Sequence, residues 1–145
     1  MFNDLIQRAL ALHQGGRLAE AEPVYRQLLA GGADDFQIHF MYAVLLYQQQ
    51  RFGDALGAVA KALQRDPQSM DALGLQAALQ QTTGRAAEAF DTLSRIVDRA
   101  PGHGDAWYNR GVVLIDLERW EEAVASFDRA LAIQPTPMAW TNRAS

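Results

Sequence analysis

The amino-acid sequence predicts an all-α protein built from paired helices that stack one after another. The first observation is a period of 34 residues, which places an alanine in four equivalent positions: Ala21, Ala55, Ala89 and Ala123. The same period places an arginine in four others: Arg17, Arg51, Arg85 and Arg119. A third column is always small: Ala9, Ala43, Ala77 and Gly111. A fixed period of this size is typical of repeat proteins, because each unit buries its apolar face only against its neighbours.

The repeats are expected to hold two helices each and to span about residues 2–35, 36–69, 70–103 and 104–137. In the first repeat, apolar residues recur at the spacing of a helix face. They are Leu5, Ala9 and Leu12 on the first helix and Leu18, Ala21, Tyr25 and Leu28 on the second. Pro23 lies early in this second helix and lacks a backbone donor, so we expect the helix to begin late or irregularly.

The second and third repeats keep the same phase as the first. Larger side chains stand beside the small columns and fill the space: Tyr25, Val59, Leu93 and Phe127. An acid follows the arginine by three residues in every repeat: Glu20, Asp54, Glu88 and Glu122. Both charges suit the helix ends that they flank, so helix-end electrostatics explains the arginine column without a ligand. Asp34 and Ser69 are candidate N-caps of the helices that begin the second and third repeats.

The fourth repeat shows the most complete pattern. Its two helices carry Trp107, Gly111 and Leu114, then Trp120, Ala123, Phe127 and Ala130, and Pro135 follows. This pattern resembles the tetratricopeptide repeat, and the resemblance covers about residues 2–135. It implies a single domain over residues 1–145, a right-handed α-solenoid of four helix-turn-helix repeats plus the start of a fifth. In that family the first helices line a concave groove that binds proteins and peptides.

The end of the chain resembles the start of another repeat, at residues 138–145. Residues 139–144 repeat residues 106–111, one position closer than the period. We therefore expect the N-terminal part of a longer protein that binds a protein or peptide segment in the groove. Residues 16–22 resemble bacterial repeat proteins, and the resemblance implies that a glycosyltransferase of the O-linked N-acetylglucosamine type or a sulfotransferase follows. The alternatives are a self-association or assembly domain, or a substrate-recruiting domain of such a transferase. Two copies are expected to pair through the uncapped C-terminal end, with Trp140 near the contact.

The composition of the chain limits which classes of partner can be expected. The chain has 145 residues, 49% of them hydrophobic, and no cysteine, which fits a reducing, cytoplasmic setting. The net charge is -4, from 17 acidic and 13 basic residues, and the bases are spread along the chain, so nucleic acid is not expected as a partner. No segment reaches the roughly 18 uninterrupted apolar residues of a membrane span, and the first residues lack the basic region of a signal peptide.

The family resemblance implies which side chains face the groove. The candidate peptide-binding residues are Phe40, Val44, Tyr47, Asp71, Gln81, Asp105, Tyr108, Asn109, Val112 and Asn142. Rigid aromatic rings with scattered polar groups suit an extended or helical peptide, but the same rings could instead pack in the core. Asn109 and Asn142 share a column, which resembles the asparagine ladder with which O-linked N-acetylglucosamine transferases hold a peptide backbone.

Other kinds of site find little support in the sequence. The expected groove lacks the lysine, arginine and asparagine set with which chaperone-cofactor repeats clamp a terminal carboxylate. The three histidines, His13, His39 and His103, fall in different columns without paired-ligand spacing, so no metal or cofactor is expected. No nucleophile elbow or glycine-rich phosphate loop occurs, and the chain is not expected to be an enzyme.

Overall fold

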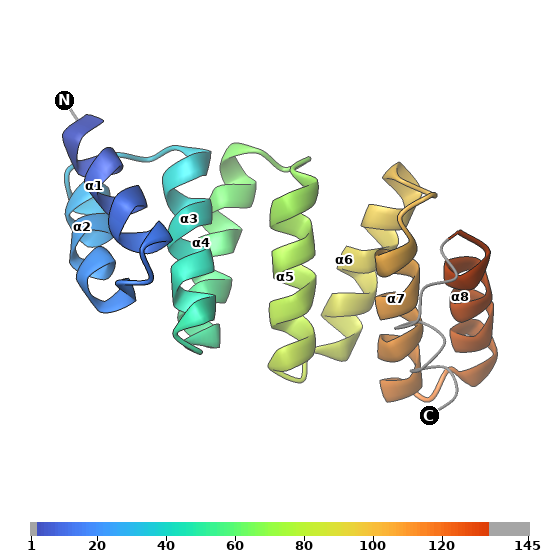
Figure 1. Ribbon diagram of the computed structural model, residues 1–145. Coiled ribbons are helices and arrows are strands. Elements are labelled where there is room, and N and C mark those ends of the chain that lie inside the picture. The colour runs from blue at the N-terminus through green and yellow to red at the C-terminus, as the bar shows by residue number, and fades with distance from the viewer. Residues whose placement is uncertain (1–2, 134–145) are drawn as a thin grey trace. The chain divides into compact units, whose positions relative to one another are not determined.

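The computed structural model describes residues 3–133, and this range contains eight α-helices and no β-strand (Figure 1). The helices are α1 (Asn3–Gln14), α2 (Leu18–Ala30), α3 (Phe36–Gln48), α4 (Phe52–Arg65), α5 (Met70–Thr82), α6 (Ala86–Arg99), α7 (Gly104–Asp116) and α8 (Trp120–Ile133). The all-α, helix-turn-helix prediction is confirmed. The expected fifth repeat, Trp140 and the pairing through the C-terminal end lie outside the described residues.

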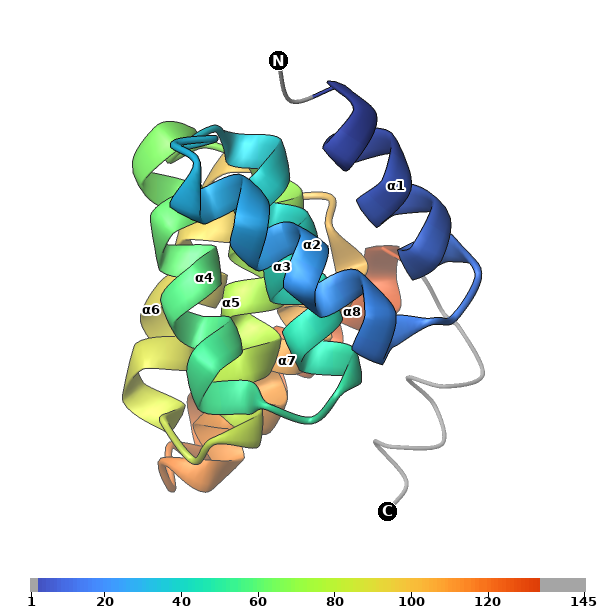
Figure 2. The ribbon, with the colours of Figure 1, turned by 90° about the vertical axis from the view of Figure 1, so that its left-hand side faces the viewer.

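The chain divides into two compact units, Met1–Ala72 and Leu73–Ser145, with the boundary inside α5. In the first unit α1 packs on α2, α2 on α3, and α3 on α4, so that successive helices are neighbours (Figure 2). In the second unit α6 packs on α7, and α7 on α8. Within each unit, contacts between consecutive helices are those that a repeat array makes.

The small columns lie in the interior of the helix pairs. Ala21, Ala55 and Ala89 have no exposed surface, and Ala123 is 2% exposed. Gly111 of α7 lies against the ring of Phe127 on α8, where an added Cβ would approach a ring atom to 2.8 Å. A small residue in these columns therefore allows two helices to approach closely, as the sequence predicts.

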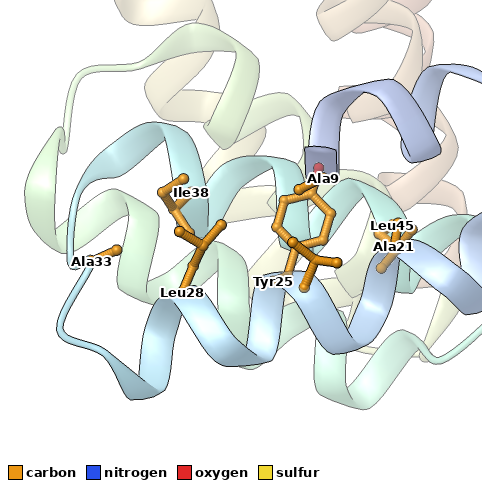
Figure 3. Close-up of a cluster of buried hydrophobic side chains, with 8 residues drawn as sticks. Ala9, Ala21, Tyr25, Leu28, Ala33, Ile38 and Leu45 are labelled. Atoms are coloured by element: carbon orange, nitrogen blue, oxygen red, sulfur yellow. The ribbon is translucent and has the colours of Figure 1, made fainter. Parts of the chain in front are cut away.

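The core of the first unit forms between α2 and α3. Tyr25 and Leu28 of α2 lie in one buried cluster with Ile38 and Leu45 of α3 (Figure 3). A buried polar network joins this cluster to the helix ends. The Tyr25 hydroxyl is 2.9 Å from Nδ1 of His13, and Nε2 of His13 is 2.6 Å from Oε1 of Gln48. Burial raises the pKa of Tyr25 to about 12.

The turn between the two helices of a repeat has the same geometry throughout. The residue before each arginine has a positive φ: 77° at Gly16, 62° at Gln50, 76° at Gly84 and 59° at Glu118. The arginine N–H then donates back into the preceding helix, as from Arg17 to the carbonyl of Leu12 over 2.9 Å. These bonds satisfy carbonyl groups that a helix end leaves without a partner.

Two expectations about helix starts are wrong. The second helix of the first repeat begins at Leu18, in phase with the other repeats, and includes Pro23 in its interior. The buried face formed by Ala21, Tyr25 and Leu28 holds the helix in place although Pro23 donates no bond. The N-cap of α3 is Asp35, which accepts from the Ile38 N–H over 3.0 Å, and not Asp34.

Asp34 instead binds side chains of the second repeat. Its carboxylate lies 2.7 Å from Nε2 of His39 and accepts from the guanidinium of Arg65. The hydrogen bond with His39 and then that with Arg65 lower the pKa of Asp34. Ser69 does behave as expected, since its hydroxyl accepts from the Ala72 N–H over 3.2 Å.

Candidate functional site

One face of α3 carries the candidate residues of the first unit. Phe40, Val44 and Tyr47 recur at four- and three-residue intervals, which places them on one side of the helix. Phe40 and Val44 are half-buried, while Tyr47 is 38% exposed. Phe36–Gln48 contains no Asp, Glu, Lys or Arg, so α3 itself adds no formal charge to this face. We call Phe40, Val44 and Tyr47 the α3 face.

Neighbouring rings hold the aromatic side chains of the α3 face. Phe40 stacks on Phe36, with ring centroids 5.4 Å apart and planes at 13°. Tyr47 meets Phe52 edge to face, with centroids 5.7 Å apart and planes at 63°. A side chain held by such contacts has already lost part of its rotamer freedom before a ligand arrives. The α3 face is therefore partly preorganised for binding.

In the second unit, α7 carries the corresponding candidates. Asp105 is exposed, and Tyr108, Asn109 and Val112 are half-buried on the same side of the helix. The Tyr108 ring lies on Phe127 of α8, with centroids 5.5 Å apart and planes at 56°. Tyr108 therefore contributes to the packing of α7 on α8, whereas the ring of Tyr47 is more open to solvent.

The same side of α7 exposes one more apolar residue, which the family resemblance also implies for the groove. Ile115 of α7 is 41% exposed. It follows Val112 by three positions, so it lies on the same side of the helix. Ile115 extends the apolar part of this side of α7.

Two further candidates lie on α5. Asp71 is exposed and Gln81 half-buried, and they lie on different sides of the boundary between the units. Asn142, the second member of the expected asparagine ladder, lies outside the described residues. The structure therefore describes candidate residues on α3, α5 and α7.

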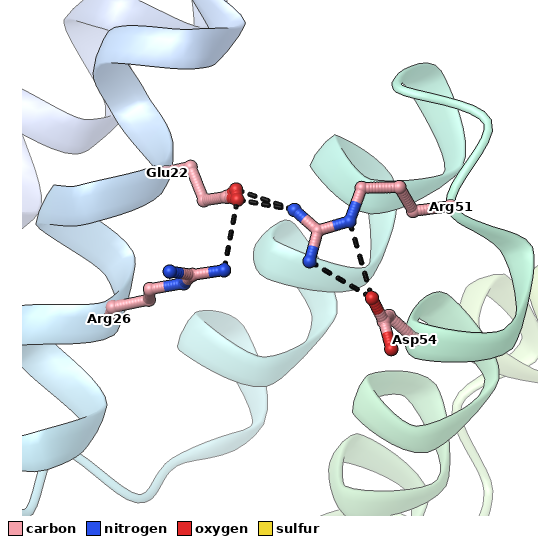
Figure 4. Close-up of polar contacts among 4 residues, drawn as sticks. All are labelled: Glu22, Arg26, Arg51 and Asp54. Carbon is pink, nitrogen blue, oxygen red and sulfur yellow. Dashed lines mark hydrogen bonds and ion pairs between the residues drawn. The ribbon is translucent and has the colours of Figure 1, made fainter.

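The arginine column has the structural role that helix-end electrostatics predicts. In each repeat the arginine pairs with the acid three residues later, from 2.6 Å for Arg119 and Glu122 to 3.7 Å for Arg85 and Glu88. Arg51 also reaches across to Glu22 of α2 while it donates to Asp54 over 2.9 Å (Figure 4). The hydrogen bond with Glu22 and then that with Asp54 raise the pKa of Arg51.

A stack of guanidinium groups and rings covers the other side of α7. The Arg110 guanidinium carbon lies 4.7 Å from the ring centroid of Phe90 and 5.5 Å from that of Trp107. Arg110 also donates to Ser94 over 3.2 Å and to Ser126 over 2.7 Å. Burial lowers its pKa. Arg110 thus connects α6, α7 and α8, and its guanidinium group is already engaged by rings and hydroxyl groups of the second unit.

Residues 3–133 include no group of three His, Cys, Asp or Glu side chains that could hold a metal ion. Over the same residues, no helix is both long enough and apolar enough to cross a membrane.

Two models of the tetratricopeptide repeat match the chain, one over residues 6–70 and one over residues 104–137. Together the two ranges cover more than half of the sequence. A protein of Solanum lycopersicum, described as the probable UDP-N-acetylglucosamine–peptide N-acetylglucosaminyltransferase SPINDLY, is 34% identical over 102 residues. That match covers 68% of this chain but only 11% of the tomato protein.

Several solved structures share the fold. YrrB, described as a repeat protein with an unusual peptide-binding site, superposes with a TM-score of 0.91 at 22% identity, over 97% of this chain and 73% of YrrB. A repeat protein of Parabacteroides merdae ATCC 43184 gives 0.87 at 20% identity, over 95% of this chain and 55% of its own. MamA of Desulfovibrio magneticus RS-1 gives 0.86 at 17% identity, over 92% and 75%. At these identities the likeness concerns the fold.

Proposed function

Because this chain belongs to the tetratricopeptide repeat family, we propose that it binds a segment of another protein on the exposed sides of its first helices. The α3 face is the main contact, and the side of α7 that carries Asn109, Val112 and Ile115 is a second one. The described repeats act by binding and not by catalysis.

The observation that carries the proposal is the exposure of Tyr47 beside Phe40 and Val44. Large apolar side chains are usually buried, and an exposed ring held by a neighbour is typical of binding hot spots. The absence of charge on the α3 face favours an apolar segment, because a carboxylate placed there would lose water without gaining a cation. The peptide-binding site attributed to YrrB, which has the same fold, supports a peptide as the ligand.

Peptides selected from a displayed library against the full chain test this function. Titration of a selected peptide, followed by ¹H–¹⁵N NMR, should shift the amides of Phe40, Val44 and Tyr47 in a saturable way. Amides of Arg95 and Asp98, which are exposed on α6, serve as the control and should not move. Selected peptides that bind without moving the amides of the α3 face contradict the assignment of this face.

The weaker alternative is a substrate-recruiting region of a longer bacterial transferase. Its support is the identity to the tomato protein, which is described as a probable N-acetylglucosaminyltransferase. Asn109 is half-buried on α7, and its amide can both donate and accept, so it suits contact with a peptide backbone. If this alternative holds, Asn109→Ala weakens many unrelated peptides equally. A self-association domain instead gives a concentration-dependent dimer in light scattering that ignores peptides.

A further inference from the structure

An open furrow lies in the first unit between α2 and α4, with α3 as its floor. It consists of two adjoining cavities of about 370 and 350 Å³, which share Leu29 of α2, His39 of α3 and Lys61 of α4. Volumes of this size lie within the range of small-ligand sites. We call these two cavities the α2–α4 furrow.

The furrow and the α3 face lie on different sides of α3. His39, Tyr42 and Leu46 line it and recur at three- and four-residue intervals. Phe40, Val44 and Tyr47 are centred roughly 130° further around the helix, so they point to a different side of α3. A ligand in the furrow therefore does not touch the α3 face.

Two glycines of α4 keep the furrow open. Gly53 and Gly57 line the larger cavity, and a Cβ built on either would meet no atom within 4 Å. At the position of Gly57 the other repeats have Pro23, Asp91 and Ala125, so the opening belongs to the second repeat. The floor and walls are partly apolar, through Leu29, Tyr42, Leu46 and Ala58.

In the second unit the equivalent positions are filled by the chain itself. In the fourth repeat, Trp107 is equivalent to His39 of the second repeat, and Arg129 is equivalent to Lys61. The Arg129 guanidinium carbon lies 5.0 Å from the centroid of the Trp107 ring. The Trp107 Nε1–H donates to the carbonyl of Pro101 over 2.8 Å. In the second unit, therefore, an aromatic ring and a cation contact each other at the positions that His39 and Lys61 hold in the first unit.

In the first unit the cation is present, but the position of Trp107 holds His39, whose smaller ring binds Asp34. Lys61 has no hydrogen bond, ion pair or ring contact among residues 3–133. The nearby arginines are already paired, Arg51 with Glu22 and Asp54, and Arg65 with Asp34. Lys61 is therefore the charge in the furrow that remains available to a ligand, and an ammonium group is attracted to the face of an aromatic ring.

We propose that the α2–α4 furrow binds an aromatic side chain, above all a tryptophan, of a partner protein. The ring lies against Leu29 and Tyr42 beneath Lys61 and beside His39, where the larger Trp107 ring meets Arg129 in the second unit. Its N–H reaches the carbonyl of Ala33, which is equivalent to that of Pro101. This second surface goes beyond the α3 face and does not depend on it.

N-acetyl-tryptophanamide, titrated into the full chain and followed by ¹H–¹⁵N NMR, tests the proposal. We expect saturable shifts of the Gly53 and Gly57 amides, with no matching change at Tyr47. N-acetyl-leucinamide should bind about threefold more weakly or worse, because it lacks a ring for Lys61, and Lys61→Gln should remove this preference. Shifts confined to the α3 face, or equal affinity for both probes, overturn the proposal.

Two variants that fill the furrow complete the test. His39→Trp copies the second unit, and Gly57→Leu places a side chain in the larger cavity; each should abolish the saturable shift at Gly53. Ala60→Leu, on an exposed part of α4 outside the furrow, should bind the probe as the unaltered chain does. If His39→Trp does not fold by circular dichroism, Gly57→Leu decides. Unchanged binding by a folded furrow-filling variant contradicts the proposal.

Discussion

Single residues carry the strain of the turns between helices. Gly16 and Gly84 take a positive φ at no steric cost, but Gln50 and Glu118 take the same conformation with a Cβ. For an L-residue this conformation costs roughly 1–2 kcal/mol. The sequence shows glycine in two of the four positions, so the turn was predictable and the strain at the other two follows from it.

Replacing the strained residues should therefore stabilise the protein. Gln50→Gly and Glu118→Gly should each raise the free energy of unfolding by about 1 kcal/mol, as the relief of strain exceeds the added chain entropy. Urea denaturation measures the change. Gln7→Gly, in the interior of α1, is the matched control and should lower stability by a similar amount. A loss of stability at both turns shows that the positive φ is not strained.

Because Gly111 contacts Phe127, a larger residue at this position should lower the stability of the protein. Gly111→Ala should destabilise the protein by about 1–3 kcal/mol, because the new Cβ would lie 2.8 Å from the ring. Gly57→Ala, where a Cβ meets open space in α4, should stabilise it by up to about 1 kcal/mol. Thermal unfolding of the two variants compares them directly. Equal melting temperatures mean that Gly111 is not in close contact.

The buried hydroxyl of Tyr25 should make stability depend on alkaline pH. Its pKa is raised to about 12 from an ordinary value of 10.0, so folding favours the neutral phenol. This contribution is complete below about pH 10 and is lost as the pH rises towards 12. Tyr25→Phe should flatten the loss of stability over that range, measured by urea denaturation at several pH values. An unchanged slope in Tyr25→Phe assigns the pH dependence to other groups.

At the scale of helices, the repeat phase decides where each element begins. α2, α4, α6 and α8 all follow an arginine of the same column, so the boundaries could be read from the period. The prediction for α2 was wrong because it weighed Pro23 alone, whereas packing of the whole buried face sets the helix start. The prediction of Asp34 as an N-cap is wrong for a related reason, since its pairing with Arg65 depends on the fold and not on local sequence.

Replacing Pro23 should therefore stabilise the protein. Pro23→Ala should stabilise α2 by about 1–3 kcal/mol, because it restores a backbone donor inside the helix. Chemical denaturation measures the gain. Ala125→Pro, at the equivalent position of α8, should cost a similar amount. If Pro23→Ala leaves the unfolding midpoint where it is, the helix has adapted to the proline.

At the scale of the whole molecule, the period predicted the helix pairs, and the resemblance to the tetratricopeptide repeat implied which candidate residues share a side of α3 and of α7. It could not predict that the Tyr108 ring packs on Phe127 while the Tyr47 ring stays more open, because contacts between helices decide this. The furrow was also missed. In the sequence it is marked only by Gly57, where the other repeats have Pro23, Asp91 and Ala125. This glycine indicates an open furrow only once the structure shows that Lys61 and His39 line the same cavity.

The central claim is that the chain binds a protein segment through the α3 face. The most direct measurement is the dissociation constant of one selected peptide for the unaltered chain and for Tyr47→Ala, by calorimetric titration. We expect Tyr47→Ala to weaken binding about tenfold, equivalent to roughly 1–2 kcal/mol. Because Tyr47 also packs on Phe52, the loss of its ring should lower the free energy of unfolding by roughly 1–2 kcal/mol, and circular dichroism should show that the variant stays folded. Equal dissociation constants for the two proteins contradict the claim.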